Sequence, residues 1–344
     1  MTDTVLVTGA SGFIAKHCIA ELLRSGYRVR ATVRANGRET AARHAIARAL
    51  SSDAGTEGNL DFVIADLSRD EGWPEAVAGC RHVLHVASPF PLKDPKNRDD
   101  LIRPARDGAI RVLKAARDAG VERVVLTSSM AAICYVPGPA PDRLMTEADW
   151  SDPDGKSLTA YLASKTIAER AAWDWHAREG GAMGLATINP GLVLGPALDG
   201  DLSSSLDVIR LYARGEYPAL PRVSYPISDV RDVARMHVLA LSHPAAMGER
   251  WICANGTMSV ADLMRAVGEA VPDLKRKLPT YVCSDFVIRG LALFDRSARS
   301  LLPDLGRNNR LDNAKARERL GFEFRDPTVA AQDAALSLRE LGVI

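Results

Sequence analysis

The sequence predicts an α/β fold built on a doubly wound parallel sheet, and three observations carry this prediction. Segments rich in β-branched residues alternate with segments of helical periodicity through the first half of the chain. A glycine turn follows the first of these strands, and a run of hydroxyl side chains ends a later one. Alternation of this kind pairs the strands in parallel and covers both faces of the sheet with helices. Ligands of such sheets bind at the carboxyl ends of the strands.

The expected elements follow one another from the N-terminus. The predicted strands are Val5–Thr8, Val29–Val33, Leu60–Ile64, His82–Val86, Val121–Thr127 and Leu185–Asn189. The predicted helices are Ile14–Ser25, Glu39–Ser51, Glu71–Ala78, Leu101–Ala119 and Thr159–Arg178. After Pro190 the pattern loosens into short segments rich in proline and glycine. We interpret this part as a smaller, discontinuous lobe, with a stretch near Ile227–Leu241 that returns to the main sheet.

The composition is that of an ordinary globular protein, and it argues against several classes of function. Lysine and arginine total 44 and aspartate and glutamate total 43, so no net field attracts nucleic acid or an anionic membrane. The five cysteines are far apart, which argues against a zinc site or a disulfide framework and fits a reducing compartment. No basic segment precedes the first strand, and the apolar run Val287–Phe294 is too short to span a bilayer. We expect a cytoplasmic protein with no metal site.

The turn after the first strand has the sequence Thr8-Gly9-Ala10-Ser11-Gly12-Phe13-Ile14-Ala15. Glycines let the backbone approach a pyrophosphate, and the N–H groups of the first helical turn favour its negative charge. Ala15 stands where a third glycine can stand. Any strand-to-helix turn could carry two glycines, so a purely structural role stays open. Together with the alternating pattern, the turn predicts a Rossmann-type dinucleotide-binding domain over residues 1–190, with a return segment at about 227–245, and a substrate-binding lobe over residues 191–226 and 246–344.

The end of the second strand indicates which dinucleotide is bound. Sites for NAD place an acidic residue roughly 20 residues after the glycines, whereas an arginine there accommodates a 2′-phosphate. This sequence has Arg34, followed by Arg38, with no acid between them. We therefore predict NADPH, with NADH disfavoured; a solvated arginine on a basic helix is the alternative. Asp66 and Leu67 follow the third strand and are placed to reach the adenine, although such an aspartate can also cap a helix.

A second group of residues predicts chemistry at the other end of the cofactor. Tyr161 and Lys165 are four residues apart on a predicted helix and therefore share one face. A nearby ammonium stabilises a phenolate and lowers the pKa of the tyrosine, which suits proton transfer to a carbonyl oxygen. The fifth predicted strand ends at Thr127-Ser128-Ser129, where a hydroxyl can bind the same oxygen. A Tyr-x-x-x-Lys spacing is common in helices, so this assignment depends on the glycine turn and the serine-ended strand.

These motifs resemble the extended short-chain dehydrogenase/reductase family, in its dihydroflavonol-4-reductase-like branch, within the NAD-dependent epimerase/dehydratase superfamily. That branch includes plant dihydroflavonol and cinnamoyl-CoA reductases and microbial aldehyde and ketone reductases. The matching residues extend over nearly the whole chain: Thr8–Ala15, Thr32–Arg34, Thr127–Ser129, Thr146-Glu147, Trp150–Asp152, Tyr161–Lys165, Asn189–Pro196, Asp229–Ala234, Asn313, Lys315 and Leu320-Gly321.

The resemblance implies a role for each matching position. Tyr161 would be the general acid in carbonyl reduction, and Lys165 would bind the nicotinamide ribose and lower the pKa of the tyrosine. Ser129 would orient the substrate carbonyl, with Ser128 as the less favoured candidate. The further positions expected to bind the cofactor are Gly9, Ser11, Gly12, Phe13, Ile14, Val86, Ala87, Ser88, Thr127, Pro190, Gly191 and Leu192. The implied enzyme is an NADP-dependent alcohol dehydrogenase or carbonyl reductase.

Mostly apolar or aromatic side chains are expected around the carbonyl, and the candidates are Phe90, Met130, Cys134, Leu192 and Tyr225. Pockets of this kind suit hydrophobic or aryl substrates, although the same residues could be core packing. Dihydroflavonol reductases carry a polar amide where this sequence has Cys134, and the cysteine–tyrosine loop motif of cinnamoyl-CoA reductases is not seen. These departures favour simpler aryl or aliphatic aldehydes and ketones. The loops Lys93–Arg103 and Pro137–Gly155 are candidate lids or plain surface.

Alternative functions share the scaffold. A hydroxysteroid dehydrogenase would use the same three residues, Ser129, Tyr161 and Lys165. A nucleotide-sensing regulator would use the same fold to bind the cofactor without catalysing a reaction. A sugar-nucleotide epimerase or dehydratase is opposed by Arg34, because those relatives usually end the second strand with an acid, and by Met130-Ala131, where dehydratases place an Asp-Glu pair. The expected partner is a small-molecule carbonyl substrate. The chain would act as a monomer or as a homodimer formed through Leu101–Ala119 and Thr159–Arg178.

Overall fold

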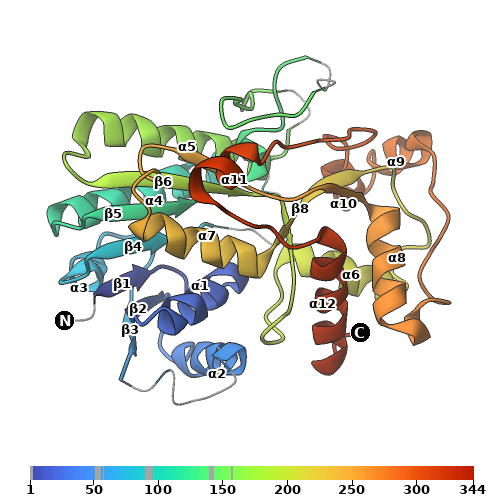
Figure 1. The fold of residues 1–344 in the computed structure, drawn as a ribbon. Coiled ribbons are helices and arrows are strands. Elements are labelled where there is room, and N and C mark those ends of the chain that lie inside the picture. The colour runs from blue at the N-terminus through green and yellow to red at the C-terminus, as the bar shows by residue number, and fades with distance from the viewer. Residues whose placement is uncertain are drawn as a thin grey trace.

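A seven-stranded parallel sheet lies at the centre of the fold, with strand order β3-β2-β1-β4-β5-β6-β9 (Figure 1). Its strands are β1 (Thr4–Val7), β2 (Arg28–Val33), β3 (Leu60–Ile64), β4 (His82–His85), β5 (Arg123–Thr127), β6 (Gly184–Pro190) and β9 (Arg250–Cys253). This computed structural model describes residues 3–50, 56, 58–89, 95, 97–138, 143–155 and 158–344. The predicted doubly wound α/β fold is confirmed, and the order reverses between β1 and β4, which is where such sheets bind ligands.

Helices cover both faces of this sheet. On one face lie α1 (Phe13–Arg24), α2 (Glu39–Leu50) and α7 (Val230–Ser242); on the other lie α3 (Trp73–Val77), α4 (Asp99–Asp118) and α5 (Ala160–Glu179). Side chains alternate along β1, so that Val5 and Val7 belong to the first core and Leu6 to the second. Helices α4 and α5, expected to mediate a dimer, pack against each other, and their pairing with a second copy stays a prediction.

A second, three-stranded sheet follows in the order β10-β8-β7. It consists of β7 (Leu192–Leu194), β8 (Ser224–Asp229) and β10 (Thr257–Ser259). The helices α6 (Ser204–Ala213), α8 (Val260–Ala270) and α12 (Pro327–Glu340) contact it. The same part of the chain also forms α9 (Asp285–Leu291), α10 (Arg296–Ser300) and α11 (Ala314–Leu320), of which α11 contacts β9. Buried residues of β1, α1, α8 and α12 belong to one continuous hydrophobic cluster. The second part of the chain therefore packs onto the first without a separate core.

Part of the expected return segment packs on the large sheet as helix α7, and the strand that joins this sheet lies outside that segment. Residues 227–229 belong to β8 of the small sheet, and 230–242 form α7, which packs against α1. The returning strand is β9, which pairs in parallel with β6 from Thr187↔Arg250 to Pro190↔Cys253. We expected residues 250–253 in the substrate lobe, because a four-residue segment that starts with arginine does not have the pattern of a buried strand.

Two general features complete the fold. All five cysteines are buried free thiols. Within the described residues, no helix combines the length and the apolar character needed to cross a membrane.

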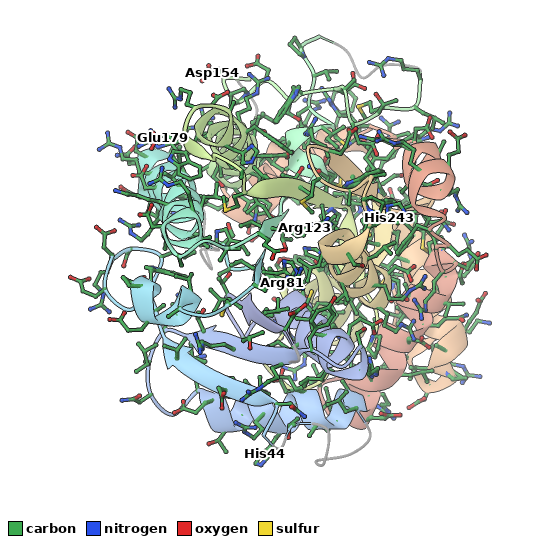
Figure 2. The ribbon with its side chains drawn as sticks, turned by 60° about the vertical axis from the view of Figure 1, so that its left-hand side comes forward. His44, Arg81, Arg123, Asp154, Glu179 and His243 are labelled. Atoms are coloured by element: carbon green, nitrogen blue, oxygen red, sulfur yellow. The ribbon has the colours of Figure 1, made fainter. Side chains whose placement is uncertain are left out.

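At the amino-terminal edge of the large sheet, Arg81 pairs with Asp3 (2.7 Å) and Glu122 (3.0 Å). Arg123, at the same edge, donates to the carbonyl oxygen of His243 at 3.2 Å; Figure 2 labels Arg81, Arg123 and His243.

Candidate active site

The glycine turn lies at the carboxyl ends of β1 and β4. Gly9 has a φ of +75°, and a Cβ placed on it would lie 2.9 Å from the Cβ of Ala87. Both facts require glycine here, because other residues disfavour this backbone region and would clash with β4. The Gly9 N–H donates to the Thr32 hydroxyl at 2.9 Å, and α1 begins at Phe13 with Gly12 as its N-cap. The turn is thus held close to three strands, with the first N–H groups of α1 beside it.

The residues expected at the adenosine end lie after β2 and β3. Arg34 and Arg38 are exposed, and Arg38 forms an ion pair with Asp201 at 3.8 Å. The Asp66 carboxylate accepts hydrogen bonds from the N–H and the hydroxyl of Ser68, which hold its pKa below the usual range, and the charge of Arg34 acts in the same direction. Leu67 packs against α4, where a Cβ placed on Gly108 would lie 3.0 Å from the Cβ of Leu67.

The three expected catalytic residues come together where β5 ends and α5 begins. Ser129 caps the 3-10 turn Met130–Ala132 (η2), and its hydroxyl accepts from the Ala131 N–H at 3.1 Å. Thr159 caps α5 through Leu162, so Tyr161 lies in the first turn of this helix. A hydrogen bond joins the side chains of Ser129 and Tyr161, and the Lys165 ammonium lies 5.8 Å from the centre of the tyrosine ring.

Burial dominates the electrostatics of Tyr161 and Lys165. Burial raises the pKa of Tyr161, and the hydrogen bond to Ser129 acts against this rise. Removal of the phenol from water thus outweighs the hydrogen bond to Ser129, and the lowering by Lys165 stays a prediction. Burial also lowers the pKa of Lys165 to about 8, while the charge of Glu169 acts to raise it. The lysine thus titrates near the neutral range.

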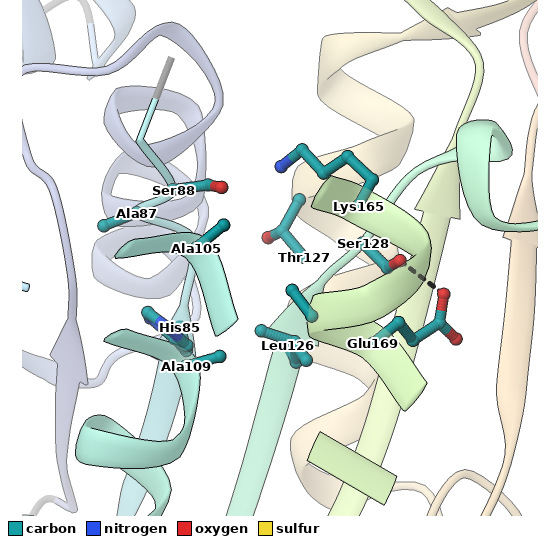
Figure 3. Close-up of a pocket in the computed structure, with 11 residues that line it drawn as sticks. His85, Ala87, Ser88, Ala105, Ala109, Leu126, Thr127, Ser128, Lys165 and Glu169 are labelled. Carbon is teal, nitrogen blue, oxygen red and sulfur yellow. Dashed lines mark hydrogen bonds between the residues drawn. The ribbon is translucent and has the colours of Figure 1, made fainter. Parts of the chain in front are cut away.

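A small cavity lies between β4, α4, β5 and α5 (Figure 3). Its lining residues are His85, Ala87, Ser88, Ala105, Ala109, Leu126, Thr127, Ser128, Lys165, Ala168 and Glu169. It brings together Ala87, Ser88, Thr127 and Lys165, four of the residues that we expected to bind the cofactor. Val86, assigned with them, is half-buried against the hydrophobic core.

The segment Pro190–Leu192 connects the two sheets. A Cβ on Gly191 would lie 2.2 Å from the carbonyl oxygen of Pro226, so glycine is required where β6 passes close to β8. The Gly191 N–H donates to the Ser228 hydroxyl at 2.8 Å. Pro190 ends β6, and Leu192 begins β7 as a half-buried side chain.

The residues expected around the substrate are in different environments. Phe90 lies outside the described residues. Met130 and Cys134 are buried in a cluster with Ile252, and burial raises the pKa of the Cys134 thiol, so this cysteine is a packed side chain in this structure. Tyr225 is half-buried and hydrogen bonds to Asp304.

The candidate lids are also partly defined. Residues 99–103 of the first loop form the start of α4, which corrects the expected loop boundary; residues 93, 94 and 96 lie outside the described residues. In the second loop the backbone carbonyls of Glu147 and Asp149 accept hydrogen bonds from Arg250, at 2.6 Å and 2.7 Å. This part of the second loop is therefore tied to β9.

Several polar residues at the site were not singled out from the sequence. Asp304 accepts from the Tyr135 hydroxyl at 2.7 Å, and burial raises its pKa to about 6. Glu169 lies one helical turn after Lys165, and this spacing could have indicated it. Arg250 binds Glu169 at 2.7 Å from a strand 81 positions later, and no local pattern points to that contact.

Known proteins resemble this chain in sequence and in fold. Residues 5–254 match the NAD dependent epimerase/dehydratase family. The chain is 34% identical to cinnamoyl-CoA reductase 1 of Arabidopsis thaliana over 341 residues, which cover 98% of this chain and 90% of that protein. It is 37% identical to cinnamoyl-CoA reductase 1 of Petunia hybrida over 285 residues, which cover 82% of this chain and 81% of that protein.

A solved structure of yeast methylglyoxal/isovaleraldehyde reductase complexed with NADPH aligns with a TM-score of 0.80 at 27% identity, covering 99% of this chain and 100% of that one. The family resemblance inferred from the motifs is confirmed by the family match and the curated relatives. The chain belongs to the NAD dependent epimerase/dehydratase family, as an oxidoreductase of the extended short-chain dehydrogenase/reductase type.

Proposed function

We propose that this protein is an NADPH-dependent reductase of aldehydes and ketones, acting on hydrophobic or aryl carbonyl substrates with Tyr161 as the general acid. The observation that carries the proposal is the convergence of Ser129, Tyr161 and Lys165, because Lys165 lines the same cavity as Ala87, the residue that approaches the glycine turn. Such a group can hold a carbonyl oxygen and protonate it. The reductase names of the relatives, and the NADPH complex of the yeast enzyme, agree with it.

The residues present fit a dinucleotide. The backbone at Gly9 leaves room where a Cβ would meet Ala87, and the N-terminus of α1 offers N–H groups to a pyrophosphate. Arg34 and Arg38 are exposed at the end of β2 and suit a 2′-phosphate. We assign Ser11, Phe13 and Ile14 to the pyrophosphate, Asp66 and Leu67 to the adenine, and Val86, Ala87, Ser88, Thr127, Pro190, Gly191 and Leu192 to the nicotinamide end.

The chemistry divides between the cofactor and the chain. When bound, NADPH supplies a hydride to the carbonyl carbon. The chain supplies the proton from the Tyr161 hydroxyl, and the Ser129 hydroxyl holds the carbonyl oxygen in line with it. The charged form of Lys165 stabilises the phenolate that remains. Positioning of these groups accounts for much of the rate.

We also propose the substrate side and the division of the chain. The large sheet, now including β9, would form the cofactor-binding part, and the small sheet with α6 and α8 to α12 would form the substrate lobe. The names of the plant relatives favour an aryl substrate, whereas Cys134 at the amide position and the unseen cysteine–tyrosine loop motif favour simple aldehydes and ketones. Met130, Leu192, Tyr225 and Phe90 stay candidate substrate contacts.

The decisive experiment is a carbonyl screen with both nicotinamide cofactors. Consumption of NADPH is followed with aliphatic and aryl aldehydes, ketones, a hydroxycinnamoyl thioester, a ketosteroid and a UDP-sugar. We expect turnover with hydrophobic aldehydes or ketones and a preference for NADPH of at least about tenfold. Conversion of the UDP-sugar to an isomer, detected by product analysis because it consumes no net NADPH, with no turnover of any carbonyl substrate, would overturn the proposal in favour of an epimerase. Tight NADPH binding without oxidation by any carbonyl would favour a nucleotide sensor.

A further inference from the structure

Glu169 is a fully buried carboxylate whose hydrogen-bond partners are all donors. The Asn189 amide donates to it at 2.7 Å, the Thr187 hydroxyl at 3.0 Å and the Arg250 guanidinium at 2.7 Å. Ser128 and the Trp173 indole N–H donate to it as well, and Figure 3 shows the Ser128 bond. An ionised carboxylate only accepts hydrogen bonds, so this site is built for an anion. A glutamine would point an NH₂ group at one or more of these donors.

Arg250 neutralises this charge and also reaches the loop before α5. Its guanidinium donates to the carbonyl oxygens of Glu147 at 2.6 Å and Asp149 at 2.7 Å, and to that of Ala132, in η2, at 3.4 Å. Its centre lies 3.6 Å from the centre of the Trp150 ring. A planar fork can make these contacts together, whereas a lysine ammonium offers one point of attachment. Arg250 thus joins α5, η2 and the loop 147–150.

The pair is connected to the reacting groups through short paths. The Asn189 amide that binds Glu169 also donates to the backbone carbonyl of Ser129 at 3.2 Å. Glu169 lies one turn after Lys165 on α5, and its charge acts on that ammonium. Of the other groups near Lys165, Tyr161 shares its helix, and His85 faces it from β4 as a neutral imidazole, because burial lowers its pKa to about 3.

We propose that Glu169 and Arg250 form a positioning pair for the reaction: together they fix the backbone of Ser129 and the ammonium of Lys165 relative to each other and hold the loop 147–150 against the site. Neither residue is assigned to the substrate or the cofactor. The inference rests on the proposed function of Ser129, Tyr161 and Lys165. A buried ion pair is weak evidence for stability alone, because desolvation offsets much of its attraction. The pair reaches Ser129 through Asn189 and acts on Lys165 through the charge of Glu169, and these two paths give it a positioning role.

The test uses the full chain with two variants and a matched control. Glu169→Gln keeps the shape but removes the charge, and Arg250→Lys keeps the charge but removes the fork. Glu249→Gln is the control, because Glu249 precedes Arg250 and pairs with Lys315 and Arg319 at 2.7 Å each, away from the reacting groups. For each protein we measure the NADPH dissociation constant, kcat per NADPH-binding site, and the pH dependence of kcat.

We expect Glu169→Gln and Arg250→Lys to lower kcat roughly 10- to 100-fold, since small misplacements of reacting groups have effects of that size. NADPH affinity should change less than about threefold. Loss of kcat at high pH should begin at lower pH in Glu169→Gln, because the carboxylate that favours charged Lys165 is gone, and should not move down in Arg250→Lys. Glu249→Gln should match the wild type in every measurement.

The proposal is overturned if both variants keep kcat within about twofold per NADPH-binding site, if the pH limb of Glu169→Gln does not move, or if the control loses as much activity. If Glu169→Gln does not fold, the double variant Glu169→Gln/Arg250→Gln, which removes both buried charges, is measured in its place. A wild-type kcat in this double variant would overturn the proposal that the two residues position the reacting groups. Wild-type activity of Tyr161→Phe would instead overturn the proposed function.

Discussion

The two ends of the site are built in different ways. At the carboxyl ends of β1 and β4 the shape comes from the backbone: the positive φ of Gly9 and the close approach of Ala87 fix the turn. At the carboxyl ends of β5 and β6 and the start of β9 the shape comes from buried polar side chains, centred on Glu169 and Arg250. A backbone-defined end depends on residues that are near one another in the sequence. A side-chain network depends on segments that only the fold brings together.

The largest expected effect is at the polar end. Tyr161→Phe removes the proposed general acid and should lower kcat by about 10²–10⁴-fold, the usual contribution of such a group. The phenol is half-buried in a helix whose other contacts remain, so thermal stability should stay near that of the wild type. Steady-state kinetics with the best carbonyl substrate check this. Retention of most of the activity would remove Tyr161 from the mechanism.

His237 is expected to make the free energy of unfolding depend on pH by about 3 kcal/mol. Its ring nitrogen lies 2.6 Å from the Thr127 hydroxyl, to which it is hydrogen bonded. Burial lowers its pKa from 6.5 to about 4. Between these values the unfolded state binds more protons than the folded one, so the stability is present above pH 6.5 and is lost as the pH falls through about 4. Urea unfolding of wild type and His237→Gln over pH 4–7 checks this. Equal slopes of unfolding free energy against pH would contradict it.

The backbone-defined end is tested by Gly9→Ala. The new Cβ would lie 2.9 Å from that of Ala87 and would sit at a φ of +75°, so we expect a loss of about 1–3 kcal/mol in the free energy of unfolding, together with weaker NADPH binding. The second variant, Gly9→Ala/Ala87→Gly, relieves the clash but leaves the backbone strain. It should therefore recover part of the stability. If no stability is recovered, the positive φ, and not the close approach of Ala87, is what requires glycine at position 9.

The smallest expected effect concerns the cofactor preference. Arg34→Ala removes an exposed guanidinium at the end of β2 and should reduce the preference for NADPH over NADH by roughly tenfold, about 1.4 kcal/mol, without a change in kcat. The ratio of kcat/KM for the two cofactors measures it, with Arg28→Ala, at the other end of β2, as the control. An unchanged ratio would point to Arg38 or to a site without phosphate selection.

The same contrast explains what the sequence could predict. The strands and helices of the first half, the glycine turn and the Tyr161–Lys165 face all follow from local patterns, and the family resemblance added Ser129. The strand β9 was missed because its first residue is Arg250, whose charge is compensated by Glu169 on another element. Asp304 was missed for a similar reason, since Tyr135 and Tyr225 reach it only in the folded chain. Long-range compensation of buried polar groups leaves no local sequence pattern.

The buried cysteines can report local opening of the folded protein through their rates of alkylation. Thiolates react with alkylating reagents, and burial raises the pKa of Cys18, Cys134 and Cys253 while shielding each sulfur from contact. Labelling of the folded chain should therefore be slow, and its rate at each position would measure how often that part of the molecule opens. Cys18 lies in α1 beside the glycine turn, whereas Cys253 ends β9. Comparing their labelling rates with and without NADPH would show which end of the site the cofactor holds closed.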